Sequence, residues 1–382
     1  MTSEQLRSLF HLDENLIFLN HGAFGACPKP VFDEWRRWQE VIERRPEEFM
    51  WRRLDEYLEI PRKALAGLLG ADHSAIALVP TTTTGINIVA RSLKLGPGDE
   101  VLTTDHEYGA IDRTWRFITR RRGAAYITRK LALPLATEDD FIEQFWSGVT
   151  ERTKVISISH MTSPTALIFP LARICRRARE AGIITIIDGA HVPGHIAVNL
   201  TDLGADFYTG NCHKWLCSPR GAGFLYARPD MQPLIEPLVV SWGYEAEQPS
   251  GSTFQDYLGW VGTSDVSPYM AIEAAIRFQN DHDWDSVRRR CHGVAVELRQ
   301  RLLDRFGEPA PANGDQWFAQ MFAVRLPDKI DHSALESTLL NEYHIEVPIK
   351  RWNDQNLLRV SIQGYNTGGD ISALESALED LI

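Results

Sequence analysis

The stretch that decides the fold is Asp206-Phe-Tyr-Thr-Gly-Asn-Cys-His-Lys-Trp-Leu-Cys-Ser-Pro-Arg-Gly-Ala-Gly-Phe-Leu-Tyr226. Residues 207–209 are β-prone, Gly210 breaks the run, and residues 221–226 begin a second apolar run, which predicts two strands joined by a tight turn. Lys214 lies in that turn. A buried ammonium is costly unless it is paired, neutral or covalently used, and the covalent use of a lysine is an imine with an aldehyde. This stretch alone supports a surface lysine equally well.

Composition indicates an ordinary globular protein with two domains. The chain has 382 residues, 44% of them hydrophobic, and a formal net charge of −11, which argues against nucleic acid as a partner. The N-terminus lacks a basic segment followed by an apolar run, and no apolar run is long enough to span a membrane. Five scattered cysteines favour reduced thiols in the cytoplasm over a disulfide framework, and their spacing predicts no metal site.

Strand-like and helix-like segments alternate from about residue 76 to residue 226, which predicts a mostly parallel sheet covered by helices. In such sheets ligands gather at the carboxyl ends of the strands. The expected strands are 76–79, 100–104, 124–128, 153–159 and 183–188, and the expected helices between them include 110–121, 138–149 and 171–181.

Asp188 ends the most apolar of these strands, Ile183-Ile-Thr-Ile-Ile187. An aspartate at the end of a strand buried on both faces needs a cationic partner. The pyridinium N–H of pyridoxal phosphate (PLP) is such a partner, because an ionised carboxylate keeps that ring protonated. The alternative is an aspartate that caps the next helix. His191 lies just beyond the strand.

Four further segments contain candidate ligand-binding residues. Four threonines, Thr81 to Thr84, precede a helical run, and a helix N-terminus with free N–H groups and hydroxyls suits a phosphate. The alternative is that these threonines only cap the helix. Tyr108 follows the strand 100–104, where it could lie flat on an aromatic ring. The glycines of Gly22-Ala-Phe-Gly25 suggest a chain that passes close to another group such as a ligand, or an ordinary turn. The aromatic, acidic stretch 242–260 is either the entrance of a site or a surface loop.

The C-terminal part predicts a smaller α+β domain. Its expected strands are 318–326, 344–347 and 357–362, and its expected helices are 268–280, 284–306, 333–342 and 371–381. We therefore divide the chain into an N-terminal segment 1–20 that packs with the small domain, a large domain 21–265 and a small domain 266–382.

Five motifs, in this order, resemble fold-type I PLP enzymes of the class V aminotransferase group, and within it the isopenicillin N epimerase family. They are Thr104-Asp-His-Glu-Tyr-Gly-Ala110, Asp188-Gly-Ala-His191, Tyr208-Thr-Gly-Asn-Cys-His-Lys-Trp-Leu216, Ser241-Trp-Gly-Tyr244 and Tyr365-Asn-Thr367. The resemblance spans residues 19–381. It implies PLP as cofactor, an α/β fold with a mostly parallel seven-stranded sheet, helices on both faces and a smaller C-terminal domain, and a homodimer with shared sites.

The resemblance also implies the role of each site residue. Lys214 matches the lysine that binds the cofactor covalently and then moves the Cα proton, and Asp188 matches the partner of the pyridine nitrogen. His191 and Ser163 match positions beside the phenolic oxygen, and Tyr108 stacks on the ring. Phosphate-side positions are Thr82, Thr83, Asn211 and His213, with Gly262 and Thr263 reaching the neighbouring subunit. Substrate-binding positions are Asn20 and Arg359, the latter a planar fork suited to an α-carboxylate.

Residues 343–358 contain no cysteine, whereas cysteine desulfurases have a nucleophilic cysteine shortly before the position of Arg359. A persulfide mechanism is therefore not expected. The remaining reactions are epimerisation at the Cα of an amino acid, which we expect, C–S β-elimination from a cysteine conjugate or sulfoxide, and transamination. Epimerisation requires a second proton donor, for which Tyr108 and His21 are the candidates. The sequence does not identify the amino-acid substrate.

Overall fold

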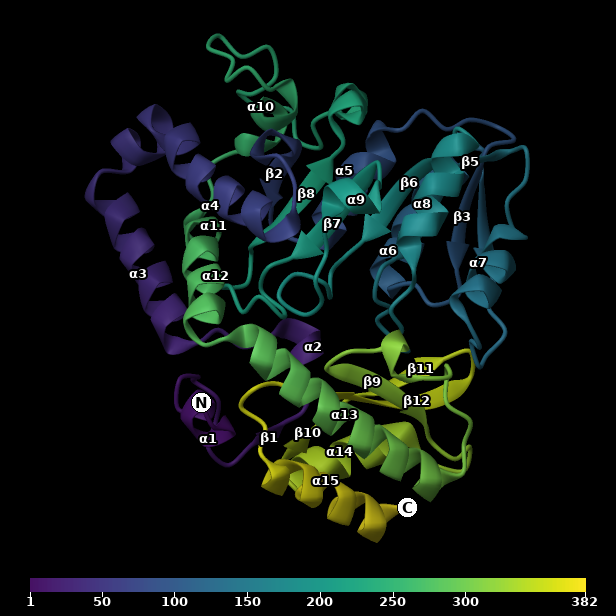
Figure 1. Cartoon of the computed structure of the whole chain (residues 1–382). Helices are drawn as coiled ribbons and strands as arrows, with labels where there is room; N and C mark the ends of the chain where they lie inside the picture. The colour runs from purple at the N-terminus through teal and green to yellow at the C-terminus, as the bar shows by residue number, and fades with distance from the viewer.

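The central element of the computed structural model, which describes residues 1–382, is a seven-stranded sheet in the order β2-β8-β7-β6-β5-β3-β4 (Figure 1). Strand β8 is antiparallel to both of its neighbours, and all other pairs are parallel. This confirms the predicted mostly parallel α/β fold. The strands are β2 (Ile76–Val79), β3 (Glu100–Thr104), β4 (Ala125–Arg129), β5 (Thr153–Ser159), β6 (Ile184–Asp188), β7 (Phe207–Asn211) and β8 (Gly223–Ala227).

Helices cover both faces of this sheet, because its inner strands are apolar on both sides. On one face Val155 and Ile186 pack with α5 (Thr82–Ser92) and α6 (Gly109–Arg122). On the other, Ile156 and Ile187 belong to the large core that includes α4 (Leu54–Leu69), α7 (Glu138–Trp146) and α8 (Leu171–Glu180). Both faces of the sheet are therefore covered, which leaves the carboxyl ends of its strands as the expected place for a ligand.

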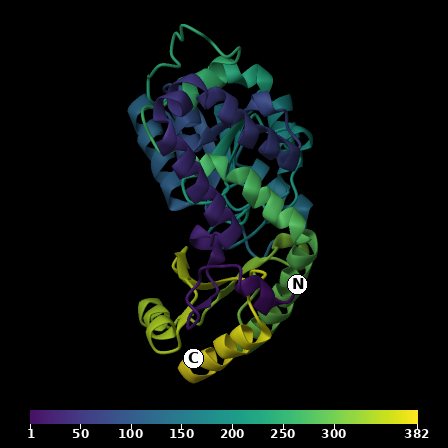
Figure 2. The same ribbon diagram turned by 90° about the vertical axis from the view of Figure 1, so that its left-hand side faces the viewer.

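A smaller unit lies below the carboxyl ends of the parallel strands (Figures 1 and 2). It contains the antiparallel sheet β11-β12-β9 and the parallel pair β1–β10. Strand β1 pairs Ile17 with Ile345, so the N-terminal segment joins this unit. Its elements are β1 (Ile17–Phe18), β9 (Met321–Arg325), β10 (Ile345–Glu346), β11 (Ile349–Trp352), β12 (Gln355–Ser361), α13 (Trp284–Phe306), α14 (His332–Asn341) and α15 (Gly368–Leu381).

The junction between the two units is formed by helices. α11 (Ser267–Met270) and α12 (Ile272–Asp281) pack against α4 and against α3 (Lys29–Arg44), beside the large sheet. From there α13 runs across to β9 of the small unit. The division expected at residue 265 therefore falls before two helices that contact the large unit, and it stays a prediction. None of the helices combines the length and the hydropathy that a membrane-spanning segment requires.

Two short segments differ from the sequence expectation. Residues 349–352 form β11, which the sequence analysis did not predict, and Asn353 and Asp354, both with positive φ, make its turn into β12. His21–Phe24 is a single helical turn, α2. Gly25, at φ 69°, passes so close to the Lys214 turn that a Cβ there would lie 1.9 Å from the His213 carbonyl oxygen. The group approached by this glycine segment is thus the lysine turn itself.

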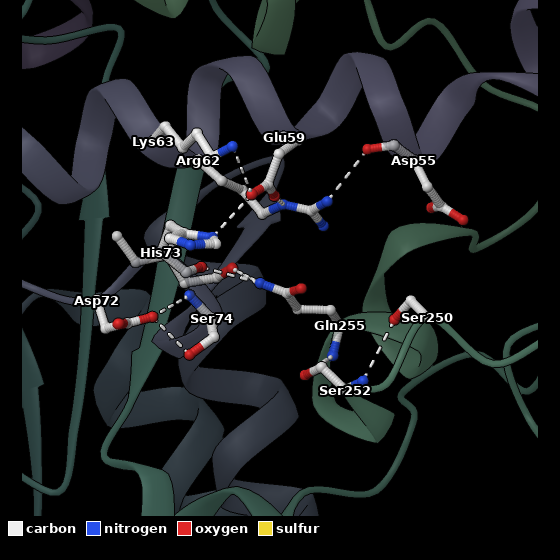
Figure 3. A network of polar contacts seen from close by, with 11 residues as sticks. Asp55, Glu59, Arg62, Lys63, Asp72, His73, Ser74, Ser250, Ser252 and Gln255 are labelled. Carbon is white, nitrogen blue, oxygen red and sulfur yellow. Dashed lines mark hydrogen bonds and ion pairs between the residues drawn. The ribbon is translucent and has the colours of Figure 1, made fainter.

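A polar network at the opposite end of the sheet ties α4 to α10 (Thr253–Gly259) and to the segment before β2 (Figure 3). Gln255 donates to the carbonyl oxygens of His73 and Ile76 at 2.9 and 3.0 Å. Glu59 pairs with Arg62 and lies 2.8 Å from His73 Nδ1. The network fixes the start of β2, the strand that leads into the threonine segment.

The Gln255→Ala variant is expected to lower the free energy of unfolding by about 1–3 kcal/mol, because two part-buried carbonyl groups lose their donor. Urea denaturation followed by circular dichroism measures this change. Gln248→Ala is the matched control, since Gln248 is exposed and makes no hydrogen bond. Equal stability of the two variants would contradict the assigned role of Gln255.

Candidate active site

The candidate site lies where the parallel strands end and the small unit begins. Asp188 is the last residue of β6, and it pairs in register with Thr209 of β7 and Ser159 of β5. Lys214 follows β7 in the turn to β8, and Arg359 comes from β12 of the small unit. The fold thus brings together side chains from three separate regions of the sequence, at the sheet edge where α/β proteins bind ligands.

A chain of hydrogen bonds leads through His191 to Lys214. Trp215 Nε1, which can only donate, lies 3.3 Å from His191 Nδ1, and His191 Nε2 lies 3.2 Å from Lys214 Nζ. The proton of the neutral imidazole must therefore sit on Nε2 and point to the lysine. Burial holds the pKa of His191 well below its usual range, so the ring is neutral. In this tautomer the His191 Nε2–H can donate only to the unprotonated form of the Lys214 amine.

The electrostatic environment of Lys214 acts in the same direction. Burial lowers the pKa of Lys214 to about 8, and the positive charge of Arg359 contributes, against the opposing effect of Asp188. A lysine with a lowered pKa is nucleophilic near neutral pH. Lys214 can therefore attack a carbonyl carbon and accept a proton.

The rate at which cofactor-free protein incorporates PLP is expected to rise with pH and to level off above about 8, because only the unprotonated amine attacks an aldehyde. Stopped-flow absorbance at a series of pH values measures it. An ordinary lysine would give a rate that still rises steeply at pH 9 to about 10. Such a profile would contradict the assigned environment of Lys214.

Asp188 is the one carboxylate whose charge acts on the pKa of Lys214, and it is buried at the end of β6. It accepts the Ala190 N–H at 2.9 Å, while burial raises its pKa and the Lys214 charge opposes that rise. Glu107 is a second buried carboxyl group, and the charge of Asp188 acts on it. It accepts hydrogen bonds from Thr104 Oγ1 and Ser159 Oγ at 2.7 and 2.6 Å. Burial raises the pKa of Glu107 to about 8. A cation beside Asp188, such as a pyridinium N–H, would relieve the burial cost of its charge.

The threonine segment places polar groups beside the lysine turn. The Thr82 N–H donates to Asn211 Oδ1 at 2.9 Å, which joins the start of α5 to the end of β7. Thr82 Oγ1 and His213 Nδ1 are buried without any hydrogen-bond partner. Thr83 follows in the first turn of α5, and its carbonyl oxygen accepts from Asn87. Unpaired polar atoms at a helix N-terminus fit an anionic group such as a phosphate, so the PLP phosphate fits here.

Arg359 and Ser163 lie together, close enough for the charge of Arg359 to lower the pKa of Lys214. Arg359 Nη1 donates to the Ser163 carbonyl oxygen at 2.6 Å and approaches Ser163 Oγ at 3.3 Å, whereas its buried Nε has no partner. Burial lowers the pKa of Arg359 to about 10. Asn20 belongs to the same region, since it bridges to Ser361 of β12 and donates to Glu346 at 3.1 Å. A buried guanidinium that has no carboxylate partner and a free Nε–H suits a carboxylate ligand.

The two expected proton donors differ in position. Tyr108 caps α6 and is 50% exposed, so its phenol ring is open toward solvent. His21 is buried, with Nδ1 3.0 Å from the Tyr365 hydroxyl and Nε2 3.0 Å from the Lys214 carbonyl oxygen. Burial lowers the pKa of His21 to about 3. Both ring nitrogens of His21 thus have protein partners, which link the small unit to the lysine turn. Tyr108, whose ring is half exposed, is therefore the better candidate for the second proton donor.

Gly262 and Thr263 lie apart from these residues, in the connection between α10 and α11, and Thr263 is exposed. The aromatic, acidic stretch 242–260 lies at the other end of the large sheet from Lys214 (Figure 1). Within one chain it therefore forms surface and not the entrance of the site.

Trp215 and Glu107 were not predicted from the sequence. Trp215 follows Lys214 directly, and its neighbour His195 stacks on it at a centroid distance of 3.7 Å. Glu107 precedes Tyr108 in a motif that was assigned for its aromatic residue. The sequence shows that Trp215 is next to Lys214 and Glu107 next to Tyr108. It does not show which way their side chains point, because tertiary packing decides that.

The chain is similar to known proteins over nearly its whole length. The family model described as aminotransferase class-V matches residues 32–374. The isopenicillin N epimerase of Amycolatopsis lactamdurans is 35% identical over 98% of this chain and 97% of its own length. A putative L-cysteine desulfhydrase of Oryza sativa is 28% identical over 100% of this chain and 86% of its own. Among solved structures, the cysteine desulfurase CsdA of Escherichia coli matches with a TM-score of 0.82 at 24% identity, covering 100% of both chains.

Proposed function

Because the chain belongs to the class-V aminotransferase family, we propose that it is a PLP-dependent enzyme that removes the Cα proton of an amino acid from one face and adds a solvent-derived proton to the opposite face. Bound PLP supplies an electron sink next to Cα. The observation that carries the proposal is the buried Lys214 amine, which lies 3.2 Å from His191 Nε2 at the edge of the sheet where Asp188 ends β6.

Each residue of the site has a separate role in the proposed reaction. Arg359 holds the α-carboxylate of the substrate, which fixes Cα relative to Lys214. Lys214 Nζ takes the Cα proton from one face. Asp188 keeps the ring nitrogen of the cofactor protonated, and Thr82 and His213 hold its phosphate. For inversion, Tyr108 gives a proton from the other face and regains one from solvent through its exposed hydroxyl.

Two other outcomes at the same site remain alternatives. Several relatives at 25–28% identity have names that describe L-cysteine desulfhydrases, which favours a C–S lyase acting on a cysteine conjugate or its sulfoxide. Such a reaction needs only the proton removal by Lys214 and a β-sulfur leaving group. Transamination is the third alternative.

Incubation of the holoenzyme with L-amino acids and cysteine conjugates in D₂O distinguishes these reactions. Deuterium at Cα with inversion, followed by NMR and chiral chromatography, supports the epimerase. Pyruvate and ammonia without inversion would overturn it in favour of the lyase, and a keto acid with pyridoxamine phosphate in favour of the transaminase.

We also propose a homodimer with shared sites in the cytoplasm. Large apolar side chains are exposed in the single chain, among them Phe24 at 69% and Trp242 at 66%. Exposed apolar groups of this size favour burial at an interface. Gly262 and Thr263 then reach the phosphate of the partner's site. Light scattering measures the mass, and a monomeric holoenzyme with full activity would contradict the proposal. The five free cysteines fit a reducing compartment.

A further inference from the structure

The face of the small sheet that is turned toward the large unit contains two cations. Strands alternate their side chains between faces, and Lys350 of β11 pairs directly with Leu357 of β12. Arg359 lies two residues further along β12 and therefore shares that face. Ala323, Trp352 and Leu357 form a separate apolar cluster on it. Lys350 and Arg359 are thus diagonal neighbours on adjacent strands, within reach of one ligand.

This face borders the active site. Arg359 donates to the Ser163 carbonyl oxygen, and Trp352 Nε1 donates to the Asp105 carbonyl oxygen at 2.7 Å. Both contacts connect the small sheet to segments that follow the strands of the large sheet. Lys350, which is half-buried, projects from the same face beside them.

Only one protein carboxylate, that of Glu336, opposes the charge of Lys350, and none pairs with Arg359. Burial lowers the pKa of Lys350, and the charge of Arg359 adds to that effect; Lys350 in turn helps to lower the pKa of Lys214. The opposing charge comes from Glu336, which lies exposed on α14 and already accepts the Ile349 N–H at 3.0 Å. Two cations on one face, without an anion between them, are unfavourable in the free protein.

The α-carboxylate of an amino acid neutralises only Arg359. We infer that the substrate has a second carboxylate in its side chain, which Lys350 binds while Arg359 holds the α-carboxylate. Lys350 is then the residue that determines the substrate class, an amino acid with an anionic side chain. This inference rests on the proposed function only for the role of Arg359.

Glutarate and butanoate are suitable probes, because they have two carboxylates and one, respectively, and neither has an amine that could react. Isothermal titration of the holoenzyme is expected to give about 10- to 100-fold tighter binding of glutarate, as expected for one additional charge-assisted contact. Equal affinities would overturn the inference.

Variants test the assignment to Lys350. The Lys350→Met holoenzyme is expected to lose the preference for glutarate, and Lys350→Arg to retain most of it. Arg351→Met is the matched control, because Arg351 is exposed on the opposite face and pairs with exposed Asp354 at 3.0 Å. A preference that survives in Lys350→Met, or an equal weakening of both probes, would show that Lys350 does not bind a second carboxylate.

The outcome is independent of catalysis. If Cα exchange occurs but glutarate shows no preference, the proposed function stands and the inference fails. If glutarate is preferred through Lys350 but no amino acid exchanges its Cα proton, the binding site stands and the proposed function fails.

Discussion

The Lys214→Ala holoenzyme is expected to lose its covalent bond to PLP and to exchange Cα deuterium at least about 10³-fold more slowly than the native enzyme. The side chain is both the attachment point and the group that moves the proton, and no other amine has this position. Its neighbour His191 Nε2, at 3.2 Å, cannot replace it, because that nitrogen bears the proton and its pKa is held low. Absorbance spectroscopy and NMR measure the two losses.

The matched control is Lys154→Ala, which removes an exposed lysine from β5 of the same sheet. That variant is expected to retain the absorbance spectrum and the exchange rate of the native enzyme. Circular dichroism confirms that both variants are folded. A Lys214→Ala variant that still gives a borohydride-reducible bond to PLP would contradict the assignment.

The Asp188→Asn variant is expected to slow Cα exchange by about 10²- to 10³-fold, the usual effect of removing one preorganised electrostatic contact. The amide keeps the shape of the side chain but loses the charge that stabilises a protonated ring nitrogen. The Ala190 N–H contact at 2.9 Å can persist, so the variant is expected to fold. The shift of cofactor absorbance with pH is a second measurement, and it should change only in this variant.

Asp206→Asn is the matched control for Asp188→Asn. Asp206 is also buried and lies just before β7, where it accepts the Thr185 N–H at 2.7 Å and pairs with Arg228 at 3.0 Å. Its loss is expected to reduce stability without changing the cofactor spectrum. An unchanged exchange rate in Asp188→Asn would mean that the carboxylate does not act on the cofactor.

The central sheet was predictable because its strands are short apolar runs that end at punctuating residues. Ile184–Asp188 and Phe207–Asn211 lie as the sequence predicted, and both end at the residues that form the site. The mostly parallel order followed from the alternation of strands with helices. Proximity of Asp188 and Lys214 then required only that neighbouring parallel strands end at the same edge.

The small unit was harder to predict, because its strands are short and partly charged. β11 contains Lys350 and Arg351 and follows Pro348, so it lacks an apolar run. The feature of the sequence that indicates this hairpin is the Asn353-Asp354 pair, because these residue types tolerate the positive φ of a tight turn. Without that hairpin, the pairing of Lys350 with Arg359 on one face cannot be derived.

Side-chain direction was the other limit. The sequence suggested His21 as a proton donor, whereas the fold turns both of its ring nitrogens toward the Tyr365 hydroxyl and the Lys214 carbonyl oxygen. The Gly25 segment was expected to approach another group, and that group is the turn that contains Lys214. Such contacts join residues nearly two hundred positions apart, and no local pattern specifies them.

The covalent bond between Lys214 and PLP is tested most directly by mass spectrometry of the holoenzyme after reduction with borohydride and digestion. If Lys214 binds PLP covalently, a single phosphopyridoxyl group is expected, attached to Nζ of Lys214. The group on any other lysine, or no modified peptide from a protein saturated with PLP, would contradict it.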